Sequence, residues 1–120
     1  MKEGIVLFAH GSRDPEWSRP FEQIALSLKK QLPAVAVALA FLEHGASLDE
    51  AVAALIAKGA ASIRIVPVFL GQGGHVKEDL PRIVADAQRA FTGVKLVLEK
   101  PIGEQRKIIE AIASAIVAGR

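Results

Sequence analysis

The sequence predicts an α/β domain built on a four-stranded parallel sheet with helices on both faces. Short runs rich in Val and Ile alternate with segments whose apolar residues lie three and four positions apart. Such alternation of strands and helices favours a parallel sheet. The runs are continuously apolar, which is typical of strands buried on both faces. They occupy residues 4–10, 34–43, 62–70 and 94–100.

The intervening segments each predict an amphipathic helix. In the second of them, Ser47 and Glu50 stand at the spacing of a capping box, which marks a helix start. Pro67 lies inside the third apolar run, where a proline weakens a central ladder, so we expect a local irregularity there. The helices are expected over residues 20–32, from 47 onward, 78–90 and 104–117.

Length and composition favour one domain spanning residues 1–120, with 51% hydrophobic and 23% charged residues. No apolar stretch is long enough to predict a membrane span, and the N-terminal apolar run is too short for a signal peptide. The absence of cysteine excludes disulfides, zinc ribbons and cysteine nucleophiles. A cytoplasmic protein is therefore expected.

The charge pattern indicates a small-molecule partner. The formal net charge is only +2, and no dense Lys/Arg block occurs, so a nucleic-acid surface is not expected. An acidic small molecule remains compatible with this composition.

All three histidines follow predicted strands. His10 ends the first run, His44 comes after Glu43 at the end of the second, and His75 lies in the glycine-rich segment after the third. The carboxyl ends of parallel strands share one edge, where ligands bind. If the first strand lies between the second and third, His10 stands between Glu43 and His75. Neighbours on a strand face opposite sides, so His44 is interpreted as a rim or packing residue.

These residue types suit divalent-metal chemistry. Imidazole binds cobalt, nickel, zinc and ferrous iron, and a carboxylate adds compensating charge. Imidazole can also accept protons near neutral pH. Gly71, Gly73 and Gly74 would let the backbone bend and approach a flat or bulky ligand.

Other motifs are incomplete. The segment GQGGHV lacks the last glycine of a dinucleotide fingerprint, and no P-loop is present. Ala9 stands where a histidine phosphatase has its phosphate-binding arginine. Ser12 has no nucleophile elbow around it, which favours a turn or capping role.

The segments LFAHGSRDP, AFLEHGASLDEAVAAL and IRIVPVFLGQGGHVKEDLP resemble the small class II tetrapyrrole chelatases, which act on sirohydrochlorin in cobalamin and sirohaem synthesis. Together they span most of residues 4–81. His44 and Ser47 depart from the family pattern, which usually has an apolar residue and a proline there.

The resemblance implies a flavodoxin-like domain that inserts Co²⁺ or Fe²⁺ into sirohydrochlorin without nucleotide hydrolysis. By position, His10 and His75 would handle metal and protons, and Glu43 would be the third ligand. Because sirohydrochlorin bears eight carboxylates, Ser12, Arg13 and Lys77 are candidate substrate-binding residues, together with the glycines at 73 and 74. Longer family members contain two such domains, so a chain of this length is expected to form a homodimer.

Several alternatives stay open at this point. Cobalt is the expected metal, and iron or nickel is the main alternative, since such sites bind these ions in a graded series. A metal or tetrapyrrole carrier without turnover would also use His10 and His75. A histidine phosphatase-like enzyme is the remaining rival, disfavoured by Ala9.

Overall fold

The computed structural model describes residues 2–71 and 73–119, without the side chain of His75. Strands and helices alternate along the chain, as the sequence predicts. The strands are β1 (Lys2–Ala9), β2 (Ala36–Phe41), β3 (Ala60–Pro67) and β4 (Lys95–Leu98). The helices are α1 (Arg19–Gln31), α2 (Leu48–Ala57), α3 (Gly74–Ala90) and α4 (Arg106–Ala118), with short 3-10 turns η1 (Pro15–Ser18) and η2 (Ile102–Glu104).

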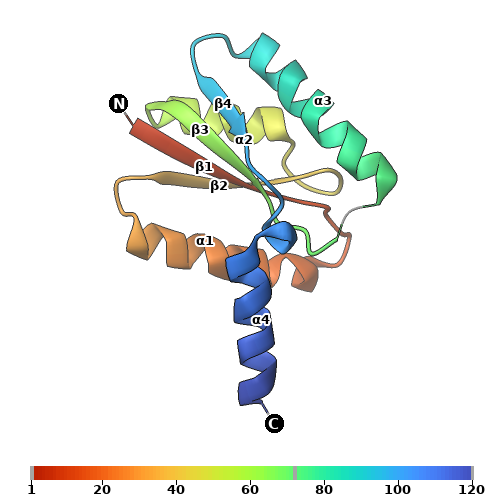
Figure 1. Ribbon diagram of the computed structural model, residues 1–120. Helices are drawn as coiled ribbons and strands as arrows, with labels where there is room; N and C mark the ends of the chain where they lie inside the picture. The colour runs from red at the N-terminus through yellow and green to blue at the C-terminus, as the bar shows by residue number, and fades with distance from the viewer. Residues whose placement is uncertain (1, 72, 120) are drawn as a thin grey trace.

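The four strands form one parallel sheet in the order β2-β1-β3-β4 (Figure 1). β1 is thus flanked by β2 and β3, which confirms the arrangement expected from the sequence. The residues from Ile5 to Ala9 are all buried, in agreement with a central strand covered on both faces.

The two faces of the sheet carry cores of different size. Val6 and Phe8 point toward α2 and α3, which cover one face and supply the larger hydrophobic cluster. Ile5 and Leu7 point to the opposite face, where α1 contributes Ala25 to a smaller cluster. Because side chains alternate along β1, this strand contributes residues to both cores.

The capping prediction for α2 is confirmed: the Ser47 hydroxyl accepts a hydrogen bond of 3.1 Å from the Glu50 backbone N–H. Pro67 is the last residue of β3, so the strand ends there and residues 68–70 lie beyond it. The missing N–H of proline is tolerated at a strand end, which replaces the irregularity expected within the strand.

Two helices differ from the sequence-based expectation. α3 begins at Gly74 rather than near Glu78, so His75 belongs to the first turn of a helix and not to a loop. α4 has no buried residue and projects away from the sheet (Figure 1). No helix among the described residues is long and apolar enough to cross a membrane.

Candidate metal-handling site

His10 and Glu43 meet at the carboxyl edge of the sheet. β1 and β2 run in parallel register up to the pair Ala9–Phe41. Hydrogen bonds continue beyond the ladder, with the Leu42 N–H donating to the Ala9 carbonyl at 3.0 Å and the Glu43 N–H to the His10 carbonyl at 3.1 Å. The two polar residues are therefore brought together by an extension of the strand pairing.

Gly11 makes this approach possible. Its φ is +99°, and a Cβ placed on it would lie 1.8 Å from the Glu43 carbonyl oxygen. A side chain at this position would have both a strained backbone and a direct clash. The sequence His-Gly at the end of β1 is thus required to bring the chain after His10 against Glu43.

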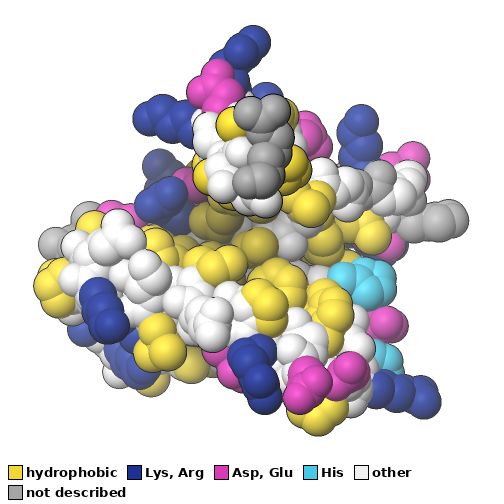
Figure 2. Space-filling view, turned by 90° about the horizontal axis from the view of Figure 1, so that it is seen from below, with side chains coloured by type: hydrophobic (Ala, Val, Ile, Leu, Met, Phe, Trp, Pro, Cys, Tyr) yellow, Lys and Arg dark blue, Asp and Glu magenta, His cyan; other side chains and the backbone are white. Residues whose placement is uncertain are grey.

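The side chains of this pair are close and accessible. The His10 Nε2 lies 3.4 Å from the Glu43 Oε1, and the two side chains are 53% and 54% exposed. Histidine and acidic side chains gather at the right-hand margin of the molecule in Figure 2. An open imidazole–carboxylate pair can receive a metal ion from solvent and release it again.

His44 lies beside the His10–Glu43 pair. Its Nε2 lies 3.8 Å from the same Glu43 Oε1, and its side chain is 33% exposed, which places it at the rim of the pair. β2 ends at Phe41, before Glu43 and His44. The rule that neighbouring residues of a strand point to opposite faces therefore does not apply to these two residues. His44 also has a φ of +58°, a left-handed conformation that is uncommon for a residue with a Cβ.

An aromatic group supports the turn beside this pair. The Trp17 ring lies 4.7 Å from that of Phe21 and 6.3 Å from that of Phe41, measured between centroids. Phe41 also packs against Gly45, where a Cβ would lie 2.5 Å from the ring. Trp17 lies in η1, between β1 and α1, outside the periodic apolar segments of the sequence.

The predicted substrate-binding residues lie on two sides of the edge. Ser12 and Arg13 follow the site histidine; the Ser12 hydroxyl accepts a hydrogen bond from the Asp14 N–H at 3.1 Å, which confirms its turn role. Arg13 and Lys77 are exposed. Lys77 lies in the first turn of α3 and lines a hollow with Glu99 and Glu104.

The glycines before α3 are conformationally ordinary. Gly73 is the N-cap of α3, with φ −70° and ψ 163°, and Gly74 is its first residue. A Cβ at either position, or at Gly71, would meet nothing within 4 Å. The chain here adopts no left-handed bend at these three residues, so what the glycines leave is open space next to the start of a helix.

The third predicted ligand, the imidazole of His75, lies outside the described residues. Its backbone is the second residue of α3, at the edge where β3 also ends. Among the described residues, no three His, Asp or Glu side chains form a group that could hold a metal ion. The described part of the site is therefore an open pair, His10 and Glu43, with His44 beside it.

Comparison with known proteins gives a consistent result. The sequence profile of the CbiX family matches residues 4–118. A protein of Sulfolobus acidocaldarius named sirohydrochlorin cobaltochelatase is 30% identical over 91% of this chain and 85% of its own length. The protein of the same name from Saccharolobus solfataricus is 31% identical over 94% of this chain and 92% of its own.

Solved structures agree in fold. A putative cobalamin biosynthesis CbiX protein from Marinobacter aquaeolei has a TM-score of 0.83 and 30% identity, covering 98% of this chain and 96% of that one. The sirohydrochlorin chelatase SirB from Bacillus subtilis, solved in complex with cobalt, has a TM-score of 0.80 and 25% identity. The matched region includes 98% of this chain but only 51% of SirB, so this chain spans about half the length of SirB.

Proposed function

The chain belongs to the CbiX family, and we propose that it is a sirohydrochlorin chelatase that inserts a divalent metal ion, Co²⁺ by preference, into sirohydrochlorin. Relatives that share about 30% of its residues over nearly their whole length bear the name sirohydrochlorin cobaltochelatase. In this proposal the chain is a metal chelatase in the class of lyases, which acts as one domain over residues 1–120 and uses no nucleotide.

The observation that carries the proposal is the exposed His10–Glu43 pair, with 3.4 Å between Nε2 and Oε1. A chelatase must bind its metal loosely enough to pass it on, which an imidazole and a carboxylate at an open edge allow better than a closed cage of four ligands. His75 is proposed as the further ligand, since the first turn of α3 lies at the same edge.

The same groups can take up the protons of the reaction. Insertion of M²⁺ forms bonds to the macrocycle nitrogens and releases two pyrrole N–H protons. A neutral imidazole or a carboxylate next to the metal is a suitable acceptor for each proton. We propose that His10 and His75 are the catalytic pair in this sense, with Glu43 compensating the charge of the metal ion.

The acidic rim of sirohydrochlorin requires donors around the site. Arg13 and Lys77 are exposed cations on the two sides of the edge, and the Ser12 hydroxyl can donate a hydrogen bond. Backbone N–H groups at the start of α3, after Gly73 and Gly74, have no side-chain cap and offer further donors to carboxylates. These five residues are proposed to hold the substrate.

Cobalt is preferred in this proposal because the relatives with matching length are named cobaltochelatases. Fe²⁺ and Ni²⁺ are the alternatives, since histidine and carboxylate ligands also bind these ions. The product would enter cobalamin or sirohaem synthesis in the cytoplasm. The chain matches only 51% of SirB, which supports a homodimer of two such domains.

The test is metal insertion followed by the absorbance spectrum of sirohydrochlorin, with Co²⁺, Fe²⁺ under reducing conditions, and Ni²⁺ in parallel. The wild type should accelerate insertion well above the spontaneous rate, fastest with Co²⁺. His10→Ala should lower the rate about 100-fold. His44→Ala, which removes a histidine from the same edge, should lower it less than about threefold.

The carrier alternative predicts a different pattern. A carrier would bind Co²⁺ in the wild type and lose it in His10→Ala, but neither protein would speed insertion. Failure of the wild type to accelerate insertion with any of the three metals would refute the proposal. Turnover of a phosphoester with phosphohistidine at His10 would favour the phosphatase alternative instead.

A further inference from the structure

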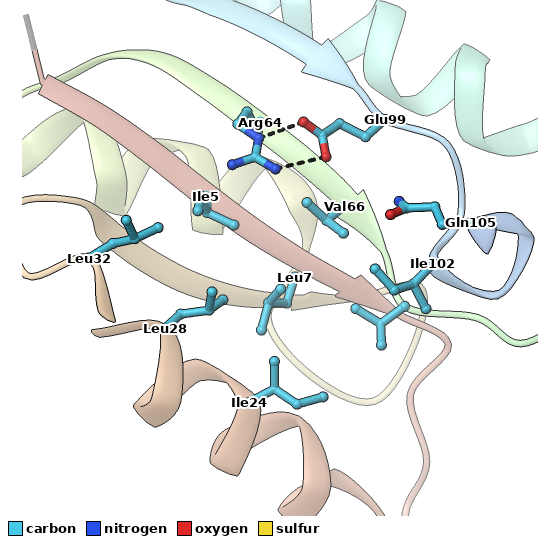
Figure 3. A pocket seen from close by; sticks show the side chains of 11 residues that line it. Ile5, Leu7, Ile24, Leu28, Leu32, Arg64, Val66, Glu99, Ile102 and Gln105 are labelled. Atoms are coloured by element: carbon cyan, nitrogen blue, oxygen red, sulfur yellow. Dashed lines mark hydrogen bonds and ion pairs between the residues drawn. The ribbon is translucent and has the colours of Figure 1, made fainter. Parts of the chain in front are cut away.

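The apolar groove between α1 and the sheet is poorly suited to a metal ion. Its floor is formed by β1 and β3, and the carboxylate in its lining belongs to Glu99 (Figure 3). The Arg64 guanidinium donates to this carboxylate from Nε and from a terminal nitrogen, at 2.5 and 3.0 Å. The hydrogen-bonded carboxylate raises the pKa of Arg64, so the pair stays charged and closed. A carboxylate that a metal ion can reach is found instead at the carboxyl edge of the sheet.

That carboxylate, Glu43, has an imidazole within reach from two different loops. Its Oε1 lies 3.4 Å from the His10 Nε2 and 3.8 Å from the His44 Nε2. No three His, Asp or Glu side chains of the described residues form a group that could hold a metal ion together. Each imidazole therefore forms a separate two-ligand position with the same carboxylate.

The two distances suit a bridging metal ion. Imidazole nitrogens and carboxylate oxygens lie about 2.1 Å from a bound Zn²⁺ ion, so two such atoms at the tetrahedral angle are about 3.4 Å apart. The distance from Glu43 to His10 has this value, and the distance to His44 is longer by about 0.4 Å. The Glu43 side chain is 54% exposed, so it is free to rotate and close this difference.

The loop after β2 holds His44 in a conformation with an energetic cost. The Phe41 N–H donates to the Ala46 carbonyl at 2.8 Å, which closes the loop around residues 42–45. Gly45 lies against the Phe41 ring, where an added Cβ would come within 2.5 Å. His44 itself has a φ of +58°. Left-handed residues with a Cβ concentrate at functional sites, where the surrounding structure maintains the strain.

Stability does not account for the side chain of His44. Among the described residues its polar partner is the Glu43 carboxylate, and the two side chains are 33% and 54% exposed. Contacts between charged groups at such exposed positions contribute little to stability. The placement of this imidazole is better explained by a ligand that it shares with Glu43.

The order of the strands gives the two imidazoles different positions along the edge. β2 is the edge strand, β1 is next to it, and α3 follows β3. His44 comes after β2 and His10 after β1, so His10 is nearer to the space proposed for the macrocycle at the start of α3. An ion bound between His44 and Glu43 therefore lies on the side away from the macrocycle.

From this arrangement we infer that His44 is a metal-capturing ligand, which takes up a divalent cation from solvent together with Glu43 and passes it to the His10–Glu43 pair. The inference rests on the proposed chelatase function, because it concerns how that enzyme obtains its metal ion. In the transfer, the His44 imidazole leaves the ion as the His10 imidazole binds it, and Glu43 remains a ligand throughout. The ions concerned are those that imidazole and carboxylate share, such as Co²⁺, Fe²⁺ and Ni²⁺.

The first experiment measures Co²⁺ binding to the protein alone by isothermal titration calorimetry. In His44→Gln an amide N–H can still donate to Glu43, but the imidazole ligand is lost; His44→Ala loses both the ligand and the contact. Each variant should raise the dissociation constant of Co²⁺ about tenfold. Glu110→Gln, which removes an exposed carboxylate from α4, is the control and should leave the constant within about twofold of the wild type.

The second experiment measures insertion into sirohydrochlorin at increasing Co²⁺ concentration. His44→Gln should raise the KM for Co²⁺ about tenfold, because capture is weakened. The rate at saturating Co²⁺ should fall less than about threefold, the limit given above for His44→Ala, because His10 and Glu43 remain. Glu110→Gln should change neither quantity.

Three results would overturn the inference. They are a Co²⁺ dissociation constant that is unchanged in both His44 variants, a constant that rises in His44→Ala but not in His44→Gln, and a lower saturating rate with an unchanged KM for Co²⁺. The second of these results would mean that His44 only orients Glu43. A wild type that does not accelerate insertion, combined with weakened Co²⁺ binding in both variants, would refute the proposed function and still support His44 as a ligand.

Discussion

The two sides of the carboxyl edge are built differently, although glycine is prominent in both. On the β1–β2 side, Gly11 is in the left-handed region and has no room for a side chain next to Glu43. On the β3–α3 side, Gly71, Gly73 and Gly74 have no such backbone requirement and no neighbour within 4 Å of an added Cβ. The first glycine serves the fold, and the others leave space where a ligand can approach.

The contrast distinguishes the side of the edge that holds a preformed pair of polar side chains from the side that is open to a ligand. The His10–Glu43 pair is fixed by strand pairing and by Gly11 before any ligand arrives. The start of α3 offers open surface and uncapped N–H groups instead. Substitutions on the first side should therefore affect stability, and substitutions on the second side should affect substrate binding.

The largest effect is expected for Gly11→Ala. The strained φ and the clash with the Glu43 carbonyl should together reduce the free energy of unfolding by about 3 kcal/mol. Gly71→Ala is the matched control and should change it by less than about 0.5 kcal/mol. Urea unfolding of both variants measures the difference. Equal stabilities would mean that Gly11 is not required for the close approach.

For Gly74→Val the expected effect is smaller, and it concerns substrate binding rather than stability. A Cβ added at Gly74 meets nothing within 4 Å, so the unfolding free energy should change by less than about 1 kcal/mol. It would occupy the space proposed for the macrocycle and should raise the KM for sirohydrochlorin about tenfold, a loss of about 1.4 kcal/mol in binding. At Gly93, which lies at the opposite edge of the sheet, an added Cβ also meets nothing within 4 Å, and Gly93→Val should leave KM unchanged. A KM unaffected in both variants would contradict substrate access at the start of α3.

The smallest effect concerns His44. Because its φ is +58°, His44→Gly should raise the unfolding free energy by about 0.5 kcal/mol despite the loss of the exposed contact with Glu43. His44→Ala keeps the Cβ and should give no gain. Thermal unfolding of the two variants shows whether left-handed strain is stored at this position. If His44→Ala raised the unfolding free energy as much as His44→Gly, left-handed strain at this position would be excluded.

Much of the fold was predictable because the strands are continuous apolar runs. The run from Ile5 to Ala9 predicts a buried central strand, and it is one. The meeting of His10 and Glu43 follows from parallel strands whose carboxyl ends share an edge. The capping function of Ser47 follows from local spacing alone.

Other features depend on contacts that periodicity does not encode. The glycines before His75 suggest a loop, yet α3 begins at Gly74. Helix propensity is a weak guide to where a helix begins, because the packing of residues such as Leu80 can override it. The spacing of Ile112 and Ile116 predicts an apolar helix face but not its partner. The conformation of His44 is set by the loop after β2, and the sequence pattern does not predict the conformation of that loop.

The most direct test of the central claim is to locate Co²⁺ on the protein by nuclear magnetic resonance. In amide spectra recorded during a Co²⁺ titration, paramagnetic broadening should begin at residues 10–13 and 43–45 and reach the start of α3. In His10→Ala this selective broadening should be lost, while the spectrum elsewhere stays that of the folded wild type. Broadening centred away from His10 and Glu43, or equally strong in the variant, would contradict a metal-handling site at this edge.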